Sequence, residues 1–280
     1  MQNKNDILVS VIMAFWNGDN SEFVKIAIES ILNQTYKNLE LIISVGGKIS
    51  EEKQILLKSF AKKDSRVKVI LNDKNIGPSY SRNRGIEVAK GEYCAIADSD
   101  DIFFTDKIEK QLEYIVSKNL DILGCGYVEF RNNHETEIGK IRIMPKTNKE
   151  IIKSLPFANP IANSALFIKT SVIKEIPYDE DFRPGEGEDY DLIINLIKAK
   201  KTAENLPEPL FFYRLGDNFE KKHANINPGI KDLKHKLKAS SVLPFYYFPT
   251  IVLIAILAFI SRLFPPKLFN FLRDLRHKIF

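Results

Sequence analysis

Residues 75–101 read NIGPSYSRNRGIEVAKGEYCAIADSDD, and this stretch decides the fold. A helix is predicted over residues 78–90, because proline is favoured in a first helical turn and Pro78 opens the segment. The apolar run 93–97 follows as a predicted strand, and the acidic cluster 98–101 comes directly after it. In a parallel α/β sheet ligands bind at the carboxyl ends of the strands, so this acidic turn is a candidate site.

The same alternation of strand and helix extends towards the N-terminus. Strands are predicted at residues 8–13, 39–43, 67–71 and 93–97, with helices that begin near Ser21, Glu51 and Pro78. We expect Ser21 to cap the first helix, and one side of that helix carries Phe23, Ile26, Ala27, Ser30 and Ile31. Short apolar runs separated by helices predict an α/β fold, with a mostly parallel, Rossmann-like nucleotide-binding sheet covered on both faces.

The rhythm changes after about residue 120. Longer strands are predicted at 121–130 and 138–144, a further strand at 163–168 and a helix at 189–199. The loops 156–160 and 177–187 are rich in Pro, Asn and Gly, which suits a substrate-binding half built on loops.

Composition excludes several classes of protein. The 280 residues are 44% apolar and 28% charged, which is ordinary for a folded domain. The two cysteines, Cys94 and Cys125, each lie in an apolar run, so buried free thiols are expected rather than a disulfide framework. The apolar run 7–16 has the length of a signal peptide, but polar residues precede it and no small-residue cleavage site follows. We interpret it as a first strand of a protein that is not secreted.

Charge is concentrated at the C-terminus. Residues 221–280 hold 11 Lys and Arg against 2 Asp and Glu, whereas the rest of the chain holds 30 against 34. The basic residues flank the charge-free run 239–261, and residues 262–280 form a basic amphipathic stretch. This pattern favours an anionic membrane surface over nucleic acid as the partner of the tail. An interfacial or re-entrant segment, a single span and a helix packed on the catalytic domain or on a dimer mate remain the alternatives.

The acidic cluster needs positive charge beside it. Three carboxylates within four residues repel one another, and a hard divalent ion held by one or two of them, with phosphate oxygens around it, relieves this repulsion. Gly77 and the start of the following helix offer backbone N–H groups to an anion, and Arg82 and Arg84 can supply charge. The alternative is a solvated turn that caps the next helix.

Taken together, these motifs resemble glycosyltransferase family 2. Its sequences run Asn-x-Gly, Ala-Arg-Asn-x-Gly, Ala-x-Gly-x-Tyr, a short strand and Asp-x-Asp-Asp, and only Ser81 departs from that string here. The stretches 9–17 and 30–42 are similar to the family's first strand, helix and second strand. The resemblance covers about residues 7–215 and implies the A-type glycosyltransferase fold.

The resemblance also implies a donor site. Asp98 and Asp100 would contact the ribose and the metal-bridged diphosphate of a nucleoside-diphosphate sugar, with Mn²⁺ or Mg²⁺ as the cofactor and Asp100 as the likelier direct ligand. Trp16 aligns with an aromatic residue that stacks on the base, although plain core packing is the alternative. The residues expected to bind the nucleotide are Ala14, Phe15, Trp16, Asn17, Gly46, Asn75, Gly77, Arg82, Asp98, Ser99 and Asp100.

One departure concerns the base. Where the family ends its second strand with Asp-Asp-Gly-Ser, this chain has Val45-Gly46-Gly47-Lys48. The carboxylate that reads the uracil edge is missing, so a different base or backbone recognition is an alternative to uridine.

A second acidic cluster opens the helix near residue 189. Helix capping explains acidic residues at this position, but the family has a Glu-Asp motif there whose Asp is the general base. Carried over, Asp189 is the base and Glu188 its partner, and a carboxylate is the group that a sugar hydroxyl needs to become a nucleophile. Asn163 lies in a segment that resembles a loop facing the acceptor in the family. The alternative is a turn with no ligand role. Residues 212–214 and 221–223 resemble a flexible loop that closes over the diphosphate.

The sequence thus predicts an inverting, metal-dependent glycosyltransferase of the bacterial surface-polysaccharide type. It would move a sugar from a nucleotide sugar, with a UDP-sugar favoured, to a glycan or lipid-linked acceptor at the cytoplasmic side of the cell membrane. The predicted catalytic domain covers residues 1–220, divided into a nucleotide-sugar half (1–101) and an acceptor half (102–220), and residues 221–280 form the membrane-associating tail. The alternative is a non-catalytic homologue that binds a nucleotide sugar or serves as a scaffold.

Overall fold

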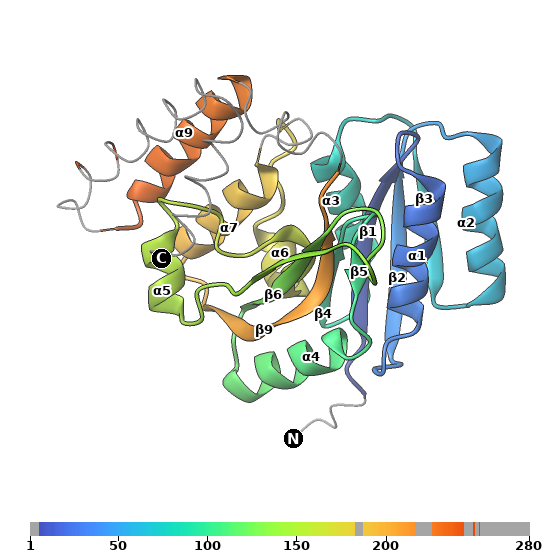
Figure 1. Ribbon diagram of the computed structural model, residues 1–280, viewed down its shortest axis with the longest axis horizontal. Helices are drawn as coiled ribbons and strands as arrows, with labels where there is room; N and C mark the ends of the chain where they lie inside the picture. Colours follow the sequence, from blue (N-terminus) through green and yellow to red (C-terminus); the bar gives the residue numbers. More distant parts are fainter. Residues whose placement is uncertain (1–5, 183–186, 217–225, 244–248, 250–251, 253–280) are drawn as a thin grey trace.

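The computed structural model describes residues 6–182, 187–216 and 226–243, together with residues 249 and 252. One nine-stranded sheet runs through these residues in the order β3-β2-β1-β4-β8-β6-β9-β5, and β7 pairs with β6 beside this path. Figure 1 shows the sheet with helices packed around it. The predicted α/β class is therefore confirmed.

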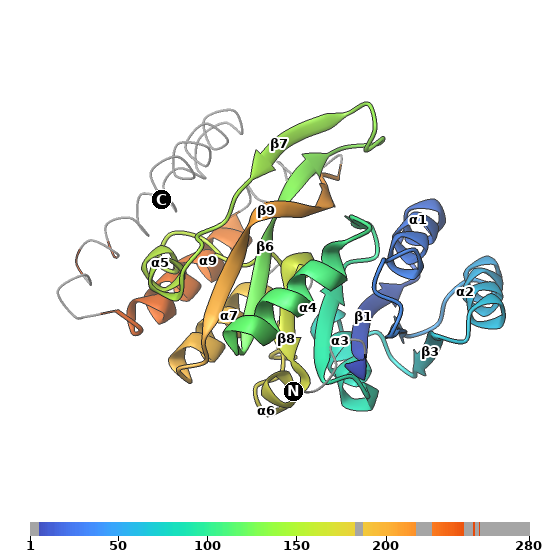
Figure 2. The same ribbon diagram turned by 90° about the horizontal axis from the view of Figure 1, so that it is seen from below.

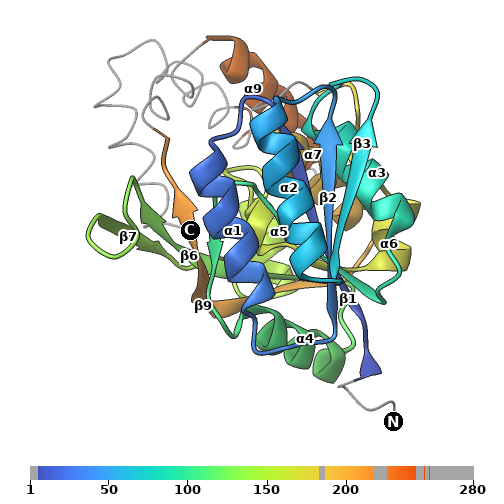
Figure 3. The same ribbon diagram turned by 90° about the vertical axis from the view of Figure 1, so that its right-hand side faces the viewer.

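The N-terminal half is a parallel sheet with helices on both faces. Its strands are β1 (Val9–Trp16), β2 (Leu39–Gly46), β3 (Val67–Asn72) and β4 (Tyr93–Ala97), all paired in parallel. Helices α1 (Ser21–Leu32) and α2 (Glu51–Lys63) cover one face, and α3 (Pro78–Val88) covers the other (Figure 3). Every residue of β2 is buried, as expected for a strand covered on both faces.

Helix α1 begins at Ser21, but its cap is the preceding residue. The Asn20 side chain accepts the backbone N–H groups of Glu22 and Phe23, so the prediction that Ser21 is the N-cap is wrong. The buried face follows the same displacement and consists of Val24, Ala27, Ile28 and Ile31. Phe23 and Ile26, predicted on that face, are only partly buried.

Helix α3 carries few apolar residues and approaches the sheet through a glycine. A Cβ atom at Gly85 would lie 2.8 Å from Cγ2 of Ile12 on β1, closer than two carbons can pack. The glycine therefore lets the helix backbone lie directly on the strand. This close approach fixes the start of α3 beside the ends of β1 and β4, where the first acidic cluster lies.

The second half is mixed. Its elements are β5 (Ile102–Phe103), α4 (Lys107–Lys118), β6 (Ile122–Phe130), β7 (Ile138–Arg142), α5 (Asn148–Ser154), η2 (Asn163–Ala165), β8 (Phe167–Lys169), α6 (Thr170–Glu175), α7 (Glu188–Lys198), β9 (Ala203–Arg214) and α9 (Ile226–Ser240). The β6–β7 hairpin projects from the body of the molecule (Figure 2). β9 pairs in parallel with β6 and antiparallel with β5, so one sheet runs through both predicted halves.

Two predictions for this half differ from the structure. The segment 163–168, predicted as one strand, is a turn of 3-10 helix followed by the three-residue β8. The twelve-residue β9 was not predicted, because Pro207 and Pro209 argue against a paired strand. The structure accommodates them through shifts of register opposite Gly126.

The first helix of the predicted tail packs on the predicted catalytic domain. Lys238 of α9 donates from Nζ to Oδ1 of Asp191 on α7 at 2.6 Å, and His235 and Lys236 are buried. These side chains are therefore not available to a membrane, and the predicted boundary at residue 220 separates α9 from the helix that it contacts. The predictions for 244–248 and 253–280 lie outside the described residues.

No helix in the described ranges has both the length and the apolar character needed to cross a bilayer. Cys94 and Cys125 are buried free thiols, as predicted, and burial raises the pKa of each to about 11.

Candidate active site

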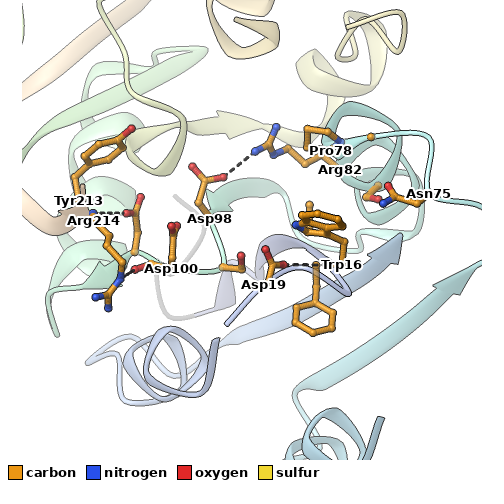
Figure 4. Close-up of a pocket in the computed structure, with 15 residues that line it drawn as sticks. Trp16, Asp19, Asn75, Pro78, Arg82, Asp98, Asp100, Tyr213 and Arg214 are labelled. Carbon is orange, nitrogen blue, oxygen red and sulfur yellow. Dashed lines mark hydrogen bonds and ion pairs between the residues drawn. The ribbon is translucent and has the colours of Figure 1, made fainter. Parts of the chain in front are cut away.

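A cleft of about 430 Å³ opens at the carboxyl ends of β1 and β4 (Figure 4). Nine of the eleven residues predicted to bind the nucleotide line it: Ala14, Phe15, Trp16, Asn75, Gly77, Arg82, Asp98, Ser99 and Asp100. They come from three separate segments that the parallel sheet brings to one edge, as expected for a ligand site in this class of fold.

The other two predicted residues do not line the cleft. Asn17 accepts the backbone N–H of Ser50 at 2.8 Å and so holds the start of α2. Gly46 ends β2 behind Asn75, and a Cβ atom there would lie 3.1 Å from Oδ1 of Asn75. Val45 is fully buried. The segment that replaces the family's base-reading carboxylate therefore supports the side chain of Asn75 and does not itself face the cleft.

Trp16 is a surface residue at the mouth of the cleft. Its side chain is 51% exposed, which excludes the core-packing alternative. Its backbone N–H donates to Oδ2 of Asp19 at 2.9 Å. In Figure 4 the indole ring lies between Asp19 and the side chains of Arg82 and Asn75. A flat aromatic face so exposed is suited to stacking on a planar ligand.

Arg82 joins the two acidic clusters. Its Nη2 donates to Oδ1 of Asp98 at 2.7 Å and its Nη1 donates to Oε1 of Glu188 at 3.1 Å. The guanidinium also lies over the ring of Tyr178, 5.4 Å from its centroid. Burial opposes the charge, but Asp98, Tyr178 and Glu188 raise the pKa of Arg82, so it remains a cation. Arg84, the other arginine of the motif, pairs on the surface with Glu87 and does not line the cleft.

Asp98 is held from a second side by the loop before β8. Asn163 donates from Nδ2 to Oδ1 of Asp98 at 2.6 Å, and Tyr178 donates its hydroxyl to Oδ1 of Asn163 at 2.9 Å. The backbone N–H of Asp98 donates to Oγ of Ser164 at 3.0 Å. Asn163 therefore holds Asp98 in position, and its contact with an acceptor hydroxyl stays a prediction.

Asp100 points into the cleft. Burial, followed by the nearby carboxylates of Asp98 and Asp19, raises the pKa of Asp100 to about 6, and Arg214 opposes this shift. Its carboxylate accepts no hydrogen bond from another side chain of the described residues. Arg82 and Asn163 both donate to Oδ1 of Asp98 and not to Oδ2. Oxygen atoms of this kind are the ligands that hard divalent ions take.

The described residues do not form a complete metal site by themselves. No group of three His, Cys, Asp or Glu side chains with the geometry of a metal site occurs in the described parts of the chain. The donor set of Asp100 and Asp98 nevertheless fits Mg²⁺ or Mn²⁺ if phosphate oxygens of a ligand and water supply the other positions.

The end of β9 closes the cleft beside Asp100. Arg214 donates from Nε to the Asp100 carbonyl and from its backbone N–H to Oδ1 of Asp101, both at 3.0 Å. The guanidinium of Arg214 stacks on the ring of Phe23 at 3.6 Å from its centroid. Residues 212–214 are therefore part of a strand and not of the predicted closing loop, and residues 221–223 lie outside the described residues.

The second acidic cluster starts α7. Glu188 is buried against Arg82, and the Oδ2 atom of Asp189 accepts from Nδ2 of Asn159 at 2.8 Å. Burial, followed by the charge of Glu188, raises the pKa of Asp189 to about 7, while Arg82 lowers it. A carboxylate that titrates near neutral pH and has one oxygen held by an amide is suited to accept a proton. Neither residue lines the 430 Å³ cleft, so Arg82 is their connection to it.

Six residues that line the cleft were not among those predicted to bind the nucleotide: Asp19, Pro78, Ser81, Asp101, Tyr213 and Arg214. Asp19 follows Asn17 in the β1–α1 loop, and burial raises the pKa of its carboxyl, but a single acidic residue in a loop carries no signal. Tyr213 and Arg214 were noted only as part of a loop, and their position beside Asp100 depends on the pairing of β9 with β5 and β6.

The sequence is similar to those of known glycosyltransferases. The sequence model of the family described as "Glycosyl transferase family 2" matches residues 10–175. The chain is 35% identical over 221 residues to the O-antigen biosynthesis glycosyltransferase WbnJ of Escherichia coli, which covers 78% of this chain and 83% of WbnJ. It is 31% identical over 209 residues to the uncharacterized glycosyltransferase MJ1057 of Methanocaldococcus jannaschii, covering 74% of this chain and 71% of that relative.

Solved structures show the same fold. A crystal structure of S. aureus TarS is similar with a TM-score of 0.63 and 17% identity, covering 91% of this chain and 71% of that chain. A structure of TarS in complex with UDP-GlcNAc has a TM-score of 0.61 and 15% identity, covering 93% of this chain and 82% of that chain. These likenesses confirm the predicted A-type glycosyltransferase fold.

Proposed function

This chain belongs to glycosyltransferase family 2, and from that premise we propose that it is an inverting enzyme that transfers a sugar from a nucleoside-diphosphate sugar to an acceptor hydroxyl. The observation that carries the proposal is Arg82, which binds Asp98 on the donor side and Glu188 on the acceptor side. A donor cleft and a candidate base thus meet at one buried cation.

The cleft suits a nucleotide sugar. Trp16 offers an exposed ring to the base, and Asn75 offers an amide that both donates and accepts hydrogen bonds. Such an amide can pair with a uracil edge in place of the missing carboxylate. TarS, which shares the fold, has been crystallised with UDP and with UDP-GlcNAc, and this supports a UDP-sugar as the donor to test first.

The diphosphate would lie beside Asp98 and Asp100, with a divalent ion between the carboxylates and the phosphate oxygens. When bound, such an ion supplies positive charge that stabilises the departing nucleoside diphosphate. Arg214 contributes a further positive charge next to Asp100. Arg82 was expected to contact the diphosphate directly, but both of its terminal nitrogens bind carboxylates, so we assign it the role of holding Asp98 and Glu188 in place.

Asp189 would act as the general base. As the acceptor oxygen bonds to the anomeric carbon, Asp189 takes the hydroxyl proton and the bond from that carbon to the phosphate oxygen breaks. Attack from the face opposite the leaving group inverts the carbon. Asn159 donates to Oδ2 of Asp189 and so fixes the orientation of the carboxylate. Glu188 stays paired with Arg82 and keeps the pKa of Asp189 high enough for exchange near neutral pH.

We further propose a glycan or lipid-linked glycan as the acceptor, in the synthesis of a cell-surface polysaccharide at the cytoplasmic face of the membrane. The similarity to an O-antigen biosynthesis enzyme supports the acceptor class. The charge-free run 239–261 and the basic stretch 262–280 that follows it support the membrane address.

A non-catalytic nucleotide-sugar-binding homologue is the second candidate, because the segment at Val45 and Gly46 lacks the family's base-reading carboxylate. The two candidates separate in one assay, the release of nucleoside diphosphate from a panel of UDP-, GDP- and dTDP-sugars with and without Mn²⁺, in the presence of a glycan or lipid-linked acceptor fraction. A transferase releases nucleoside diphosphate from the one donor that it uses, and only when its acceptor is present. A binding homologue binds a donor and releases nothing.

A further inference from the structure

A second cavity of about 430 Å³ lies at the far end of α7 from Asp189. Part of its lining is apolar and comes from Ile152 of α5 and Ile197 of α7. Its rim is basic and its remaining wall is the segment that follows α9. The residues used below are Ile152, Ile197, Lys198, Lys200, Lys201 and Val242, and we call this cavity the basic pocket.

Two of the three lysines are free to bind a ligand. Lys198 and Lys200 are exposed and have no ion pair or hydrogen bond from their ammonium groups among residues that the structure describes. Lys201 pairs with Glu175 at 2.7 Å. The basic pocket therefore presents positive charge that has no partner among the described residues, next to apolar side chains.

Helix capping explains only part of this charge. Lys198 is in the last turn of α7, where a cation is favoured by the helix dipole. Lys200 lies beyond the helix end in the left-handed region, with φ of +59°, where glycine or asparagine is easier to accommodate. The fold thus holds a lysine at a position that disfavours it, and its side chain is directed to the rim of the pocket.

The chain itself indicates what lies beside the pocket. Val242, in the wall, belongs to the charge-free run 239–261, which has 23 residues. The apolar part of the C-terminus therefore begins at the lip of a basic cavity. A lysine rim, apolar side chains in the lining and an adjoining apolar segment match the layers of a membrane surface, in which phosphates lie above acyl chains.

We propose that the basic pocket binds the phosphate of an anionic phospholipid, and so fixes the C-terminal end of α7 against the bilayer. This rests on the membrane address given under the proposed function. Membrane contact and the acceptor site would then lie at opposite ends of one helix, with Asp189 at the end away from the lipid.

The test uses the full chain and sedimentation with vesicles. Vesicles of phosphatidylcholine alone are compared with vesicles that contain 30% phosphatidylglycerol, and the gain in partitioning caused by phosphatidylglycerol is measured. The double variant Lys198→Gln, Lys200→Gln should lose about 30-fold of that gain, since a lysine near an anionic surface contributes about 1 kcal/mol. Added salt should reduce the gain of the native chain.

The matched control is the double variant Lys62→Gln, Lys63→Gln. These lysines are exposed in the last turn of α2, so the same charge is removed from an equivalent helix position. Figure 1 shows α2 at the opposite side of the molecule from α5 and α9. The control should keep the phosphatidylglycerol-dependent gain to within about twofold, because its lysines lie on the opposite side of the molecule and are screened from the pocket by salt.

Three results would overturn the proposal: equal loss in the two double variants, no loss in either, or partitioning of the native chain that is the same with and without phosphatidylglycerol. Nucleotide binding is followed in the same samples without vesicles, through the fluorescence of Trp16, the single tryptophan. Failure of nucleotide binding refutes the proposed function, whereas failure of the lipid-dependent difference refutes only the basic pocket.

Discussion

The guanidinium of Arg82 lies between Asp98, which follows β4, and Glu188, which opens α7. The family motif that contains this arginine is readable in the sequence, but its two partners are not, because they depend on how α3 and α7 meet. A buried cation shared by two carboxylates aligns the donor cleft with the candidate base and needs no ligand to do so. The predictions for single residues concern Trp16 in the donor cleft and Asp189 next to Glu188.

Trp16 provides a direct signal of nucleotide binding. It is the single tryptophan and is 51% exposed, so stacking of a base on its ring should change the intrinsic fluorescence of the protein. Trp16→Ala should weaken UDP binding about 5- to 150-fold by calorimetry, since stacking of a base on an aromatic ring contributes about 1–3 kcal/mol. Trp16→Tyr, which keeps a ring, should retain most of the affinity. Binding of UDP with no change in fluorescence and with full affinity in the alanine variant would contradict the stacking role.

The pH dependence of turnover should report Asp189. A base must be ionised to take a proton, and the pKa of this carboxyl is raised to about 7. At saturating donor, kcat should therefore rise as pH increases through about 7 and level off above it. Glu188→Gln removes the neighbouring negative charge, so the rise should move to lower pH. A kcat that stays constant from pH 5.5 to 8.5 would exclude Asp189 as the titrating base.

At the scale of elements, the contact between α3 and β1 predicts that replacing Gly85 by alanine lowers stability, the opposite of the usual effect in a helix. Gly→Ala inside a helix usually stabilises a protein, because the unfolded chain loses freedom. At Gly85 the added methyl group would lie 2.8 Å from Ile12, so Gly85→Ala should lower the free energy of unfolding by about 1–3 kcal/mol. Chemical denaturation measures this, with Val88→Ala on the exposed side of α3 as the control. Stabilisation by Gly85→Ala would show that the two elements are not in close contact.

Helix α9 should depend on α7 for its position. Asp191 accepts from Lys238 at 2.6 Å and from Asn195 at 2.8 Å, and Asp191→Ala removes both acceptors. We expect a loss of about 1–2 kcal/mol, below the range for a fully buried pair because Lys238 is about a third exposed. Hydrogen exchange of the amides of residues 233–240 should become faster. Lys234→Met, on an exposed position of the same helix, should leave it unchanged, and an equal effect of both variants would contradict this anchoring.

Elements with a strong local pattern could be predicted from the sequence, and the others could not. The runs that form β2 and β4 are mostly apolar because both faces of the sheet are covered, and α2 begins at the predicted Glu51. β9 was not predicted because Pro207 and Pro209 argue against a paired strand. Its pairing also depends on shifts of register against β6, which is distant in the sequence. The position of Arg214 in the cleft followed from that strand and was missed with it.

At the scale of the whole molecule, the sheet brings two sets of residues to one site. One set would bind the donor, and the other would accept the proton. The donor residues come from the ends of β1 and β4 and the start of α3, while the candidate base comes from the start of α7. Motifs carried from the family identified both sets in the sequence. Their connection through Arg82, Asn163 and Tyr178 is a property of the folded chain, because these side chains come from three different segments.

The separation of donor binding from proton transfer leads to the most direct test, in which donor affinity and turnover are measured together for Asp189→Asn. The substitution keeps the shape of the side chain and removes only its ability to take a proton. It should lower kcat by about 10²- to 10⁴-fold, the usual contribution of a general base, and leave the donor Kd within about twofold. Turnover equal to that of the native chain would contradict the account, because no base would then stand beside Arg82.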